Sequence, residues 1–106
     1  MILTVSPDIP GKVIIKSFGL VFGNTIRARH IGNDIMATLK NIVGGEINEY
    51  TKLMAEAREQ ALDRMSESAE QMGANAVVDV HFSTSMIMNG AAELLAYGTA
   101  VIVEDE

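Results

Sequence analysis

The longest regular pattern in the sequence is a stripe of apolar residues between residues 47 and 72. They recur at steps of three and four, which places their side chains on one face of an α-helix. Glu46 and Glu49 fall in or beside the first turn, where the helix dipole favours acidic groups, and Gly73 follows as a typical C-terminal cap. The stripe consists of Ile47, Tyr50, Met54, Ala57, Ala61, Met65, Ala69 and Met72.

Runs rich in Val, Ile and Phe predict β-strands before and after this helix. The first long run contains Gly19 and Gly23, so we expect that strand to be bent or bulged at a glycine. A hairpin connection at residues 86–90 is expected to join the last two strands. The predicted strands cover residues 1–6, 12–25, 76–85 and 91–103.

A second, shorter helix is predicted between the first long strand and the long helix. Asn33 or Asp34 would cap its start, and Gly44 with Gly45 would end it. Its apolar positions at helical spacing are Ile35, Met36, Leu39, Ile42 and Val43. Residues 1–106 are therefore expected to form a single α+β domain, with one long and one short helix layered on a sheet as a two-layer α/β sandwich.

The predicted strands carry apolar residues on both faces, whereas the helices can cover only one face of the sheet. Leaving the second face in water would expose more apolar surface than soluble monomers usually tolerate. We therefore expect a homo-oligomer that buries this face between copies. The alternative is that the short helix and the N-terminal segment cover it within one chain. The residues expected on the uncovered face are Phe18, Leu20, Phe22, Leu95, Tyr97, Val101 and Val103.

Composition narrows the range of partners. The formal net charge of -6 opposes nucleic-acid binding, which depends on Lys and Arg neutralising phosphates. The sequence has no Cys, which excludes disulfides and thiolate metal sites. No apolar stretch approaches the roughly 18 residues of a membrane span, and no secretion signal is apparent. We expect a cytoplasmic protein without a membrane partner.

A metal ion in this chain would need nitrogen and oxygen ligands. The period of two places Asp79, His81 and Ser83 on one strand face, and the hairpin brings Glu93 and Tyr97 beside them. His81, Asp79 and Glu93 are therefore candidate ligands for a divalent transition metal such as Zn²⁺, Ni²⁺ or Cu²⁺, and symmetry-related copies could complete the shell. A single His on a strand face is more often an ordinary surface or interface residue, and both interpretations stay open.

The basic residues Arg27, Arg29 and His30 precede the predicted short helix in an otherwise acidic chain. Because the first N–H groups of a helix favour anions, this cluster is a candidate site for a small anion or nucleotide. Pairing with the acidic helix face of a neighbouring copy is the plainer interpretation. No catalytic residue is predicted, since two His and no Cys leave few ways to place a base beside a nucleophile.

Short motifs of specific composition are spread along most of the chain. They are Gly23-Asn24-Thr25, Arg27 with Arg29, Ile42-Val43-Gly44-Gly45-Glu46, Tyr50, Glu56-Ala57-Arg58, Gly73-Ala74-Asn75-Ala76-Val77 and Gly98-Thr99-Ala100. With them, residues 10–103 closely resemble the YbjQ-type family of putative heavy-metal-binding domains. The resemblance implies a dodecin-like βαββ subunit with an antiparallel sheet, assembled into a ring that is a pentamer. It implies no activity for particular residues, because the family has no established biochemical role.

The sequence thus favours a non-enzymatic, homo-oligomeric binding or scaffold protein, with a metal ion or a small anion as its ligand. The alternative is a small enzyme, or a small-anion or nucleotide-binding protein, whose site forms at subunit interfaces around Arg27 and Arg29.

Overall fold

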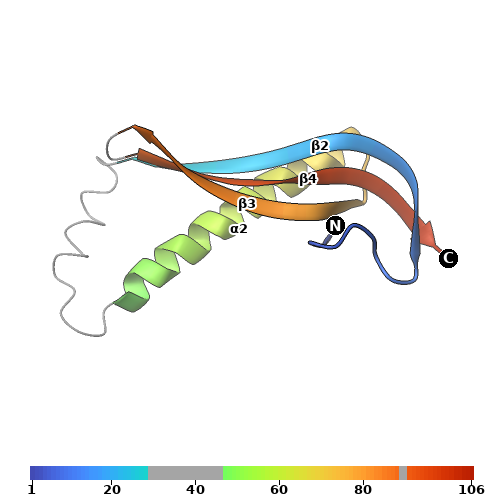
Figure 1. Ribbon diagram of the computed structural model, residues 1–106, viewed down its shortest axis with the longest axis horizontal. Helices are drawn as coiled ribbons and strands as arrows, with labels where there is room; N and C mark the ends of the chain where they lie inside the picture. Colours follow the sequence, from blue (N-terminus) through green and yellow to red (C-terminus); the bar gives the residue numbers. More distant parts are fainter. Residues whose placement is uncertain (29–46, 89–90) are drawn as a thin grey trace.

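The computed structural model describes residues 1–28, 47–88 and 91–106. These residues form a four-stranded sheet with a long helix lying diagonally across one of its faces (Figure 1). The strands lie in the order β1-β3-β4-β2. In chain order the elements are β1 (Ile2–Leu3), β2 (Lys12–Ala28), α2 (Ile47–Met72), β3 (Ala76–Met88) and β4 (Ala91–Asp105).

The sheet is mixed, which corrects the expectation of a wholly antiparallel one. β4 pairs antiparallel with both β2 and β3, whereas β1 runs parallel to β3 at its outer edge. The chain reaches this arrangement because the N-terminal segment starts beside β3 and then crosses to the start of β2, at the opposite edge (Figure 1). Beyond β1 the segment stays bonded to β3: the N–H of Thr4 donates to the carbonyl of Val77 at 3.0 Å.

The long helix has the bounds that its apolar stripe predicts, residues 47 to 72. Gly73 ends it with a φ of 98° and donates to the carbonyl of Glu70, while Ala74 donates to that of Ala69, both at 3.0 Å. This pair of bonds is the Schellman motif, which satisfies the last carbonyls of a helix. The next residue, Asn75, then ties the turn to β4 through two side-chain bonds with Val103, of 2.9 Å and 2.8 Å.

The long strands are predicted in type and position, but each extends further than expected. β2 continues to Ala28, β3 to Met88 and β4 to Asp105. The predicted hairpin connection is therefore shorter than residues 86–90, and residues 89–90 lie outside the described part. The predicted short helix falls entirely within residues 29–46, which are also outside it. In the ranges that the structure describes, α2 is the one helix.

Small residues allow α2 to touch the sheet at backbone level. Its buried side chains are mostly alanines at four-residue spacing, Ala57, Ala61 and Ala69, with Met65 among them. They face Ala96 and Ala100 of β4 and Gly23 of β2, all buried. A Cβ atom at position 23 would overlap the backbone nitrogen of Met65 and the carbonyl oxygen of Ala61. Only glycine fits this position in the observed packing.

Two polar contacts reinforce the same junction. The buried hydroxyl of Thr25 donates to the carbonyl of Ala57 at 3.2 Å, so the side chain of Thr25 is satisfied by the helix it faces. Arg64, on the exposed side of α2, reaches the edge of β2 and donates to the carbonyl of Asn24 at 2.6 Å. Together with Gly23, these residues fix how far along β2 the helix lies.

We predict that Gly23→Ala destabilises the fold by roughly 3 kcal/mol, because the added methyl group forces α2 away from β2. Gly19→Ala is the matched control: it adds the same atom where nothing lies within 4 Å, so it suffers only from the positive φ of 90° and should cost about 1 kcal/mol. Urea unfolding at a fixed protein concentration measures both. Equal losses for the two variants would contradict close packing at Gly23.

A second prediction concerns the ion pair of Lys12 and Asp105, where β2 begins and β4 ends. The hydrogen bond from Lys12, helped by its charge, holds the pKa of the exposed Asp105 carboxyl below its ordinary value of 3.8. The pair therefore stabilises the fold above that value and loses its effect as pH falls through the lowered pKa. A carboxyl NMR titration should show the pKa of Asp105 rising in Lys12→Met but not in Lys16→Met. An unchanged Asp105 midpoint in Lys12→Met would show that the pair does not form in solution.

Candidate functional site

We call the face of the sheet that points away from α2 the open face. Strand alternation assigns residues to it, because Val21, Gly23 and Thr25 of β2 are buried against the helix and their neighbours point the other way. Its large apolar members on β2 are well exposed, with Leu20 at 67%, Phe22 at 56% and Ile26 at 51%. The open face carries Leu20, Phe22, Asn24, Ile26, His81, Glu93, Leu95 and Tyr97.

Phe18 does not belong to the open face, which corrects the prediction from simple alternation. The register of β2 against β4 shifts between Ser17 and Gly19, and Gly19 adopts a φ of 90°. Such a bulge resets which side of the sheet the following residues face. Phe18 therefore packs, partly buried, against the core that α2 shares with Val21, while Leu20 and Phe22 face outward.

The far end of the same sheet face is covered by the chain itself. Val101 and Val103 form a cluster with Ala76 and Val78, and Ile9 of the N-terminal segment packs against it. Both valines are buried, so the expectation that they stay uncovered is wrong. In the alternative interpretation, the N-terminal segment covers the second sheet face within one chain. It does so only at the end of the sheet that carries Val101 and Val103.

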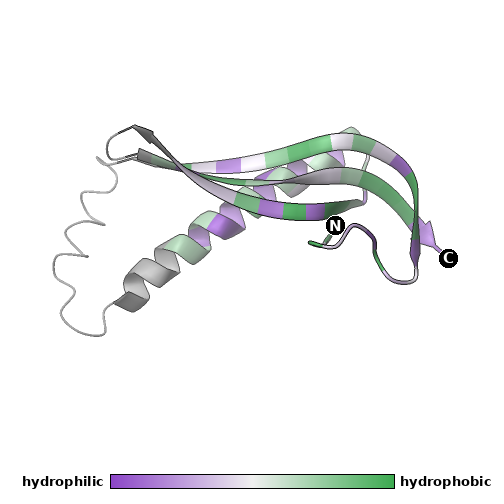
Figure 2. Cartoon of the chain, viewed as in Figure 1, coloured by the Kyte–Doolittle hydropathy of each residue, from purple (hydrophilic) through white to green (hydrophobic). Residues whose placement is uncertain are grey.

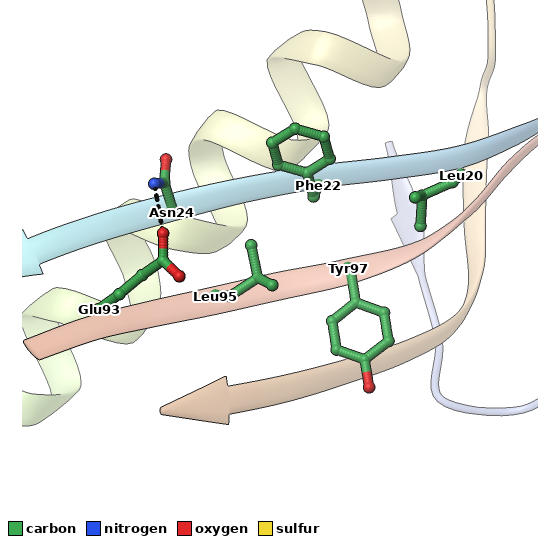
Figure 3. Close-up of a pocket in the computed structure, with 6 residues that line it drawn as sticks. All are labelled: Leu20, Phe22, Asn24, Glu93, Leu95 and Tyr97. Carbon is green, nitrogen blue, oxygen red and sulfur yellow. Dashed lines mark hydrogen bonds between the residues drawn. The ribbon is translucent and has the colours of Figure 1, made fainter. Parts of the chain in front are cut away.

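The uncovered part of the open face contains a pocket of about 500 Å³. It lies across the pair β2 and β4, where Phe22 stands directly opposite Tyr97 in the register. Figure 3 shows the side chains rising from the two strands, with Asn24 and Glu93 together at one end and the apolar groups along the rest. The lining residues are Leu20, Phe22, Asn24, Glu93, Leu95 and Tyr97.

The polar end of the pocket is a hydrogen-bonded pair. The amide nitrogen of Asn24 donates to Glu93 Oε2 at 2.9 Å, in a partly buried setting. The two residues are diagonal neighbours, since Asn24 opposes Leu95 and Glu93 opposes Ile26. Among the side chains that the structure describes, which do not include that of Arg27, the ion pair joins Lys12 to Asp105 at the other end of β2 and no basic group pairs with Glu93. The pair therefore presents negative charge beside an apolar wall.

The candidate metal ligands are spread along this face rather than gathered. His81 stands opposite Tyr97, with ring centroids 5.7 Å apart, and Glu93 stands opposite Ser85. Tyr97, which marks the position of His81, is four positions from Glu93 along β4. The two candidate ligands are therefore roughly 13 Å apart along the strand. Among the side chains that the structure describes, no three of His, Asp or Glu lie close enough together to hold a metal ion.

Asp79 is displaced by a bulge in β3. Its φ is 55°, and the register with β4 shifts between Val78 and His81. Asp79 and Val80 together oppose Gly98, where a Cβ would lie 2.8 Å from the carbonyl oxygen of Val78. The period of two therefore breaks between Asp79 and His81, and the backbone N–H of Asp79 donates to Ser6 of the N-terminal segment at 3.0 Å. The bulge at Gly19 confirms the expected bulge at a glycine of the first long strand, whereas the one at Asp79 is not predictable from the alternation of apolar residues.

The residues of the candidate anion site lie mostly outside the described part of the chain. Arg29 and His30 lie outside the described residues, and Arg27 is described only as a position of β2 opposite Ala92. The pairing of Asn24 with Glu93 is the site feature that sequence reasoning missed. Predicting this pair would have required knowledge of the register between β2 and β4, because the two residues are 69 positions apart in the sequence.

No helix in the described ranges is long and apolar enough to cross a membrane.

Comparison with known proteins gives consistent matches over nearly the whole chain. The profile of the YbjQ family, whose description reads "Putative heavy-metal-binding", matches residues 1–104. A UPF0145 protein of Dehalococcoides mccartyi is 60% identical over 104 residues, which make up 98% of this chain and 100% of that relative. A UPF0145 protein of Methanosarcina acetivorans is 57% identical over 101 residues, 95% of each chain.

A solved structure shares the fold. It is a protein of unknown function from Pediococcus pentosaceus, assigned to the DUF74 family, with a TM-score of 0.63 and 13% sequence identity. The match covers 98% of both chains. The small α+β architecture is thus found in a protein of very different sequence.

Proposed function

The chain belongs to the YbjQ family, and we propose that it is a non-enzymatic binding protein that works as a homo-oligomer and holds its ligand at the open face. The observation that carries this proposal is the exposure of Leu20, Phe22 and Ile26 on one continuous strand face. Apolar side chains gathered in this way on a soluble domain are typical of a surface that another molecule covers.

The distribution of polar and apolar residues favours a second copy of the chain as the partner that covers the open face. The outward side of α2 carries Glu56, Glu59, Asp63 and Glu67, all exposed, and Figure 2 shows hydrophilic segments alternating with weakly hydrophobic ones along the helix, with the strongest hydrophobic segments on the strands. The outward surface of α2 is thus hydrophilic in the described part of the chain, whereas Leu20, Phe22 and Ile26 make much of the open face apolar. An interface of standard size buries about 800 Å² per partner, which corresponds to roughly 20 kcal/mol before the costs of association.

We expect the assembly to be a closed ring, and the family resemblance makes a pentamer the expected number. Ring closure requires that each copy offers two different surfaces to its neighbours. The open face is one such surface, and its pocket would then lie at or beside a subunit boundary, in the cytoplasm.

A divalent transition metal is a second candidate ligand, favoured by the family's description. The donors of one chain do not fit it, since Asp79, His81 and Glu93 are not gathered in the described structure. A metal ion would need His81 side chains, or other donors, from more than one copy. His81 is exposed on the open face beside Tyr97, a position that assembly would bring near a neighbour.

We predict that size-exclusion chromatography with light scattering gives a multiple of the 11.4 kDa subunit mass at micromolar concentration. Phe22→Lys should dissociate the assembly, because it places a charge in the apolar contact, whereas Glu59→Lys on the exposed side of α2 should not. Circular dichroism would establish that both variants remain folded. A wild-type protein that elutes as a monomer would rule out the proposed assembly.

For the metal, we predict that calorimetric titration with Zn²⁺, Ni²⁺ or Cu²⁺ detects binding that weakens at least tenfold in His81→Ala, because an imidazole ligand is lost. The chain has one other histidine, so His30→Ala is the matched control. Equally weak, millimolar binding by wild type and His81→Ala would remove the metal hypothesis.

A further inference from the structure

We propose that the open-face pocket binds an organic cation, a small molecule with an apolar or aromatic body and one ammonium group. This inference rests on the proposed function, because it names the class of ligand that the binding protein holds. It also requires that the pocket stays accessible after the copies assemble.

The walls of the pocket suit a flat apolar body. Phe22 and Tyr97 are opposite each other in the register of β2 and β4, with their rings turned away from each other in Figure 3, and Leu20 and Leu95 extend the apolar surface along the strands. The pocket is an open depression of about 500 Å³ on the sheet surface, large enough to hold one side of a small aromatic molecule. Aromatic rings also attract cations over their faces, so the same walls tolerate a positive charge.

The polar end of the pocket has more free acceptors than free donors. Asn24 donates one of its two amide hydrogens to Glu93 Oε2, which leaves one N–H donor beside two acceptors, the second carboxylate oxygen of Glu93 and the amide oxygen of Asn24. A ligand that satisfies both must donate hydrogen bonds. An ammonium group does so with a charge that complements the carboxylate, and charge-assisted bonds of this kind are the stronger ones.

The basic side chains described around the pocket, those of Arg64 and Lys16, do not fill this role. Arg64 reaches the same stretch of β2 but donates to the main-chain carbonyl of Asn24, and it makes no ion pair with Glu93. Lys16 lies over the ring of Phe18, beyond the Gly19 bulge. The carboxylate would also repel an anionic ligand, and one carboxylate with an amide oxygen is too small a donor set for a transition metal.

Three probes of nearly equal shape and different charge test the inference: phenethylamine, phenethyl alcohol and hydrocinnamate. NMR titrations would map their sites on the assembled protein and give their dissociation constants. We expect phenethylamine to perturb Glu93, Leu95 and Tyr97 and to bind roughly tenfold tighter than the neutral alcohol, with the anion weakest. Equal affinities for the amine and the alcohol, or perturbations confined to another surface, would overturn the inference.

Variants separate the roles of the two ends of the pocket. Glu93→Gln keeps the shape and removes the charge, so it should abolish the preference for the amine while the alcohol binds as before. Glu104→Gln removes an exposed carboxylate away from the pocket and should change neither. Leu95→Ala should weaken the amine and the alcohol alike. A Glu93→Gln protein that still prefers the amine would contradict the assignment.

Light scattering on the same samples distinguishes failure of the inference from failure of the proposed function. An oligomer that binds none of the probes would show that a second copy fills the pocket, which overturns the inference and leaves the assembly intact. A monomer that prefers the amine would overturn the assembly and leave the ligand class standing.

Discussion

The fold depends on the direct contact of two backbones, that of β2 at Gly23 and that of α2 at Ala61 and Met65. A helix can approach a sheet this closely only if the side chains between them are small, and the helix-facing positions are accordingly filled with alanine and glycine. This requirement accounts for the scarcity of bulky groups in the main core, where Met65 is the largest fully buried side chain. The hydroxyl of Thr25 and the guanidinium of Arg64 then hold the helix at the same place along the strand.

The two faces of the sheet differ in the size of the side chains they carry. A strand alternates its side chains between two faces, so with glycine, alanine and small β-branched residues turned toward α2, the larger residues Leu20, Phe22, Leu95 and Tyr97 lie on the open face. Small side chains bury little apolar area per residue, and the core under α2 therefore contributes a modest hydrophobic term for each contact. The proposed assembly would bury additional apolar area on the open face. We therefore expect the stability of the fold to depend on association of the copies.

Local patterns in the sequence predict the helix and the strands correctly. They do not predict correctly which face of the sheet each residue lies on. The period of the apolar stripe and the position of Gly73 predict both ends of α2, and the β-branched runs locate the three long strands. The resemblance to the YbjQ family is confirmed. The bulges at Gly19 and Asp79, in contrast, shift the alternation by one residue and thereby move Phe18 into the core and Asp79 away from His81. The glycines of the first long run indicate a bulge there, and Gly19 confirms it. The side to which each following residue then turns depends on pairing with β4 and does not follow from spacing within one strand.

For the same reason, only part of the candidate site could be predicted from the sequence. Its apolar walls follow from alternation along β2 and β4, but the pair of Asn24 and Glu93 depends on a register between distant strands. A surface that served only to bury one copy against another would be more stable with apolar residues at both positions, because a carboxylate loses hydration when it is covered. Glu93 therefore costs association energy unless a positive group meets it. A charged group at the end of an apolar pocket is better explained by recognition of such a group than by assembly alone.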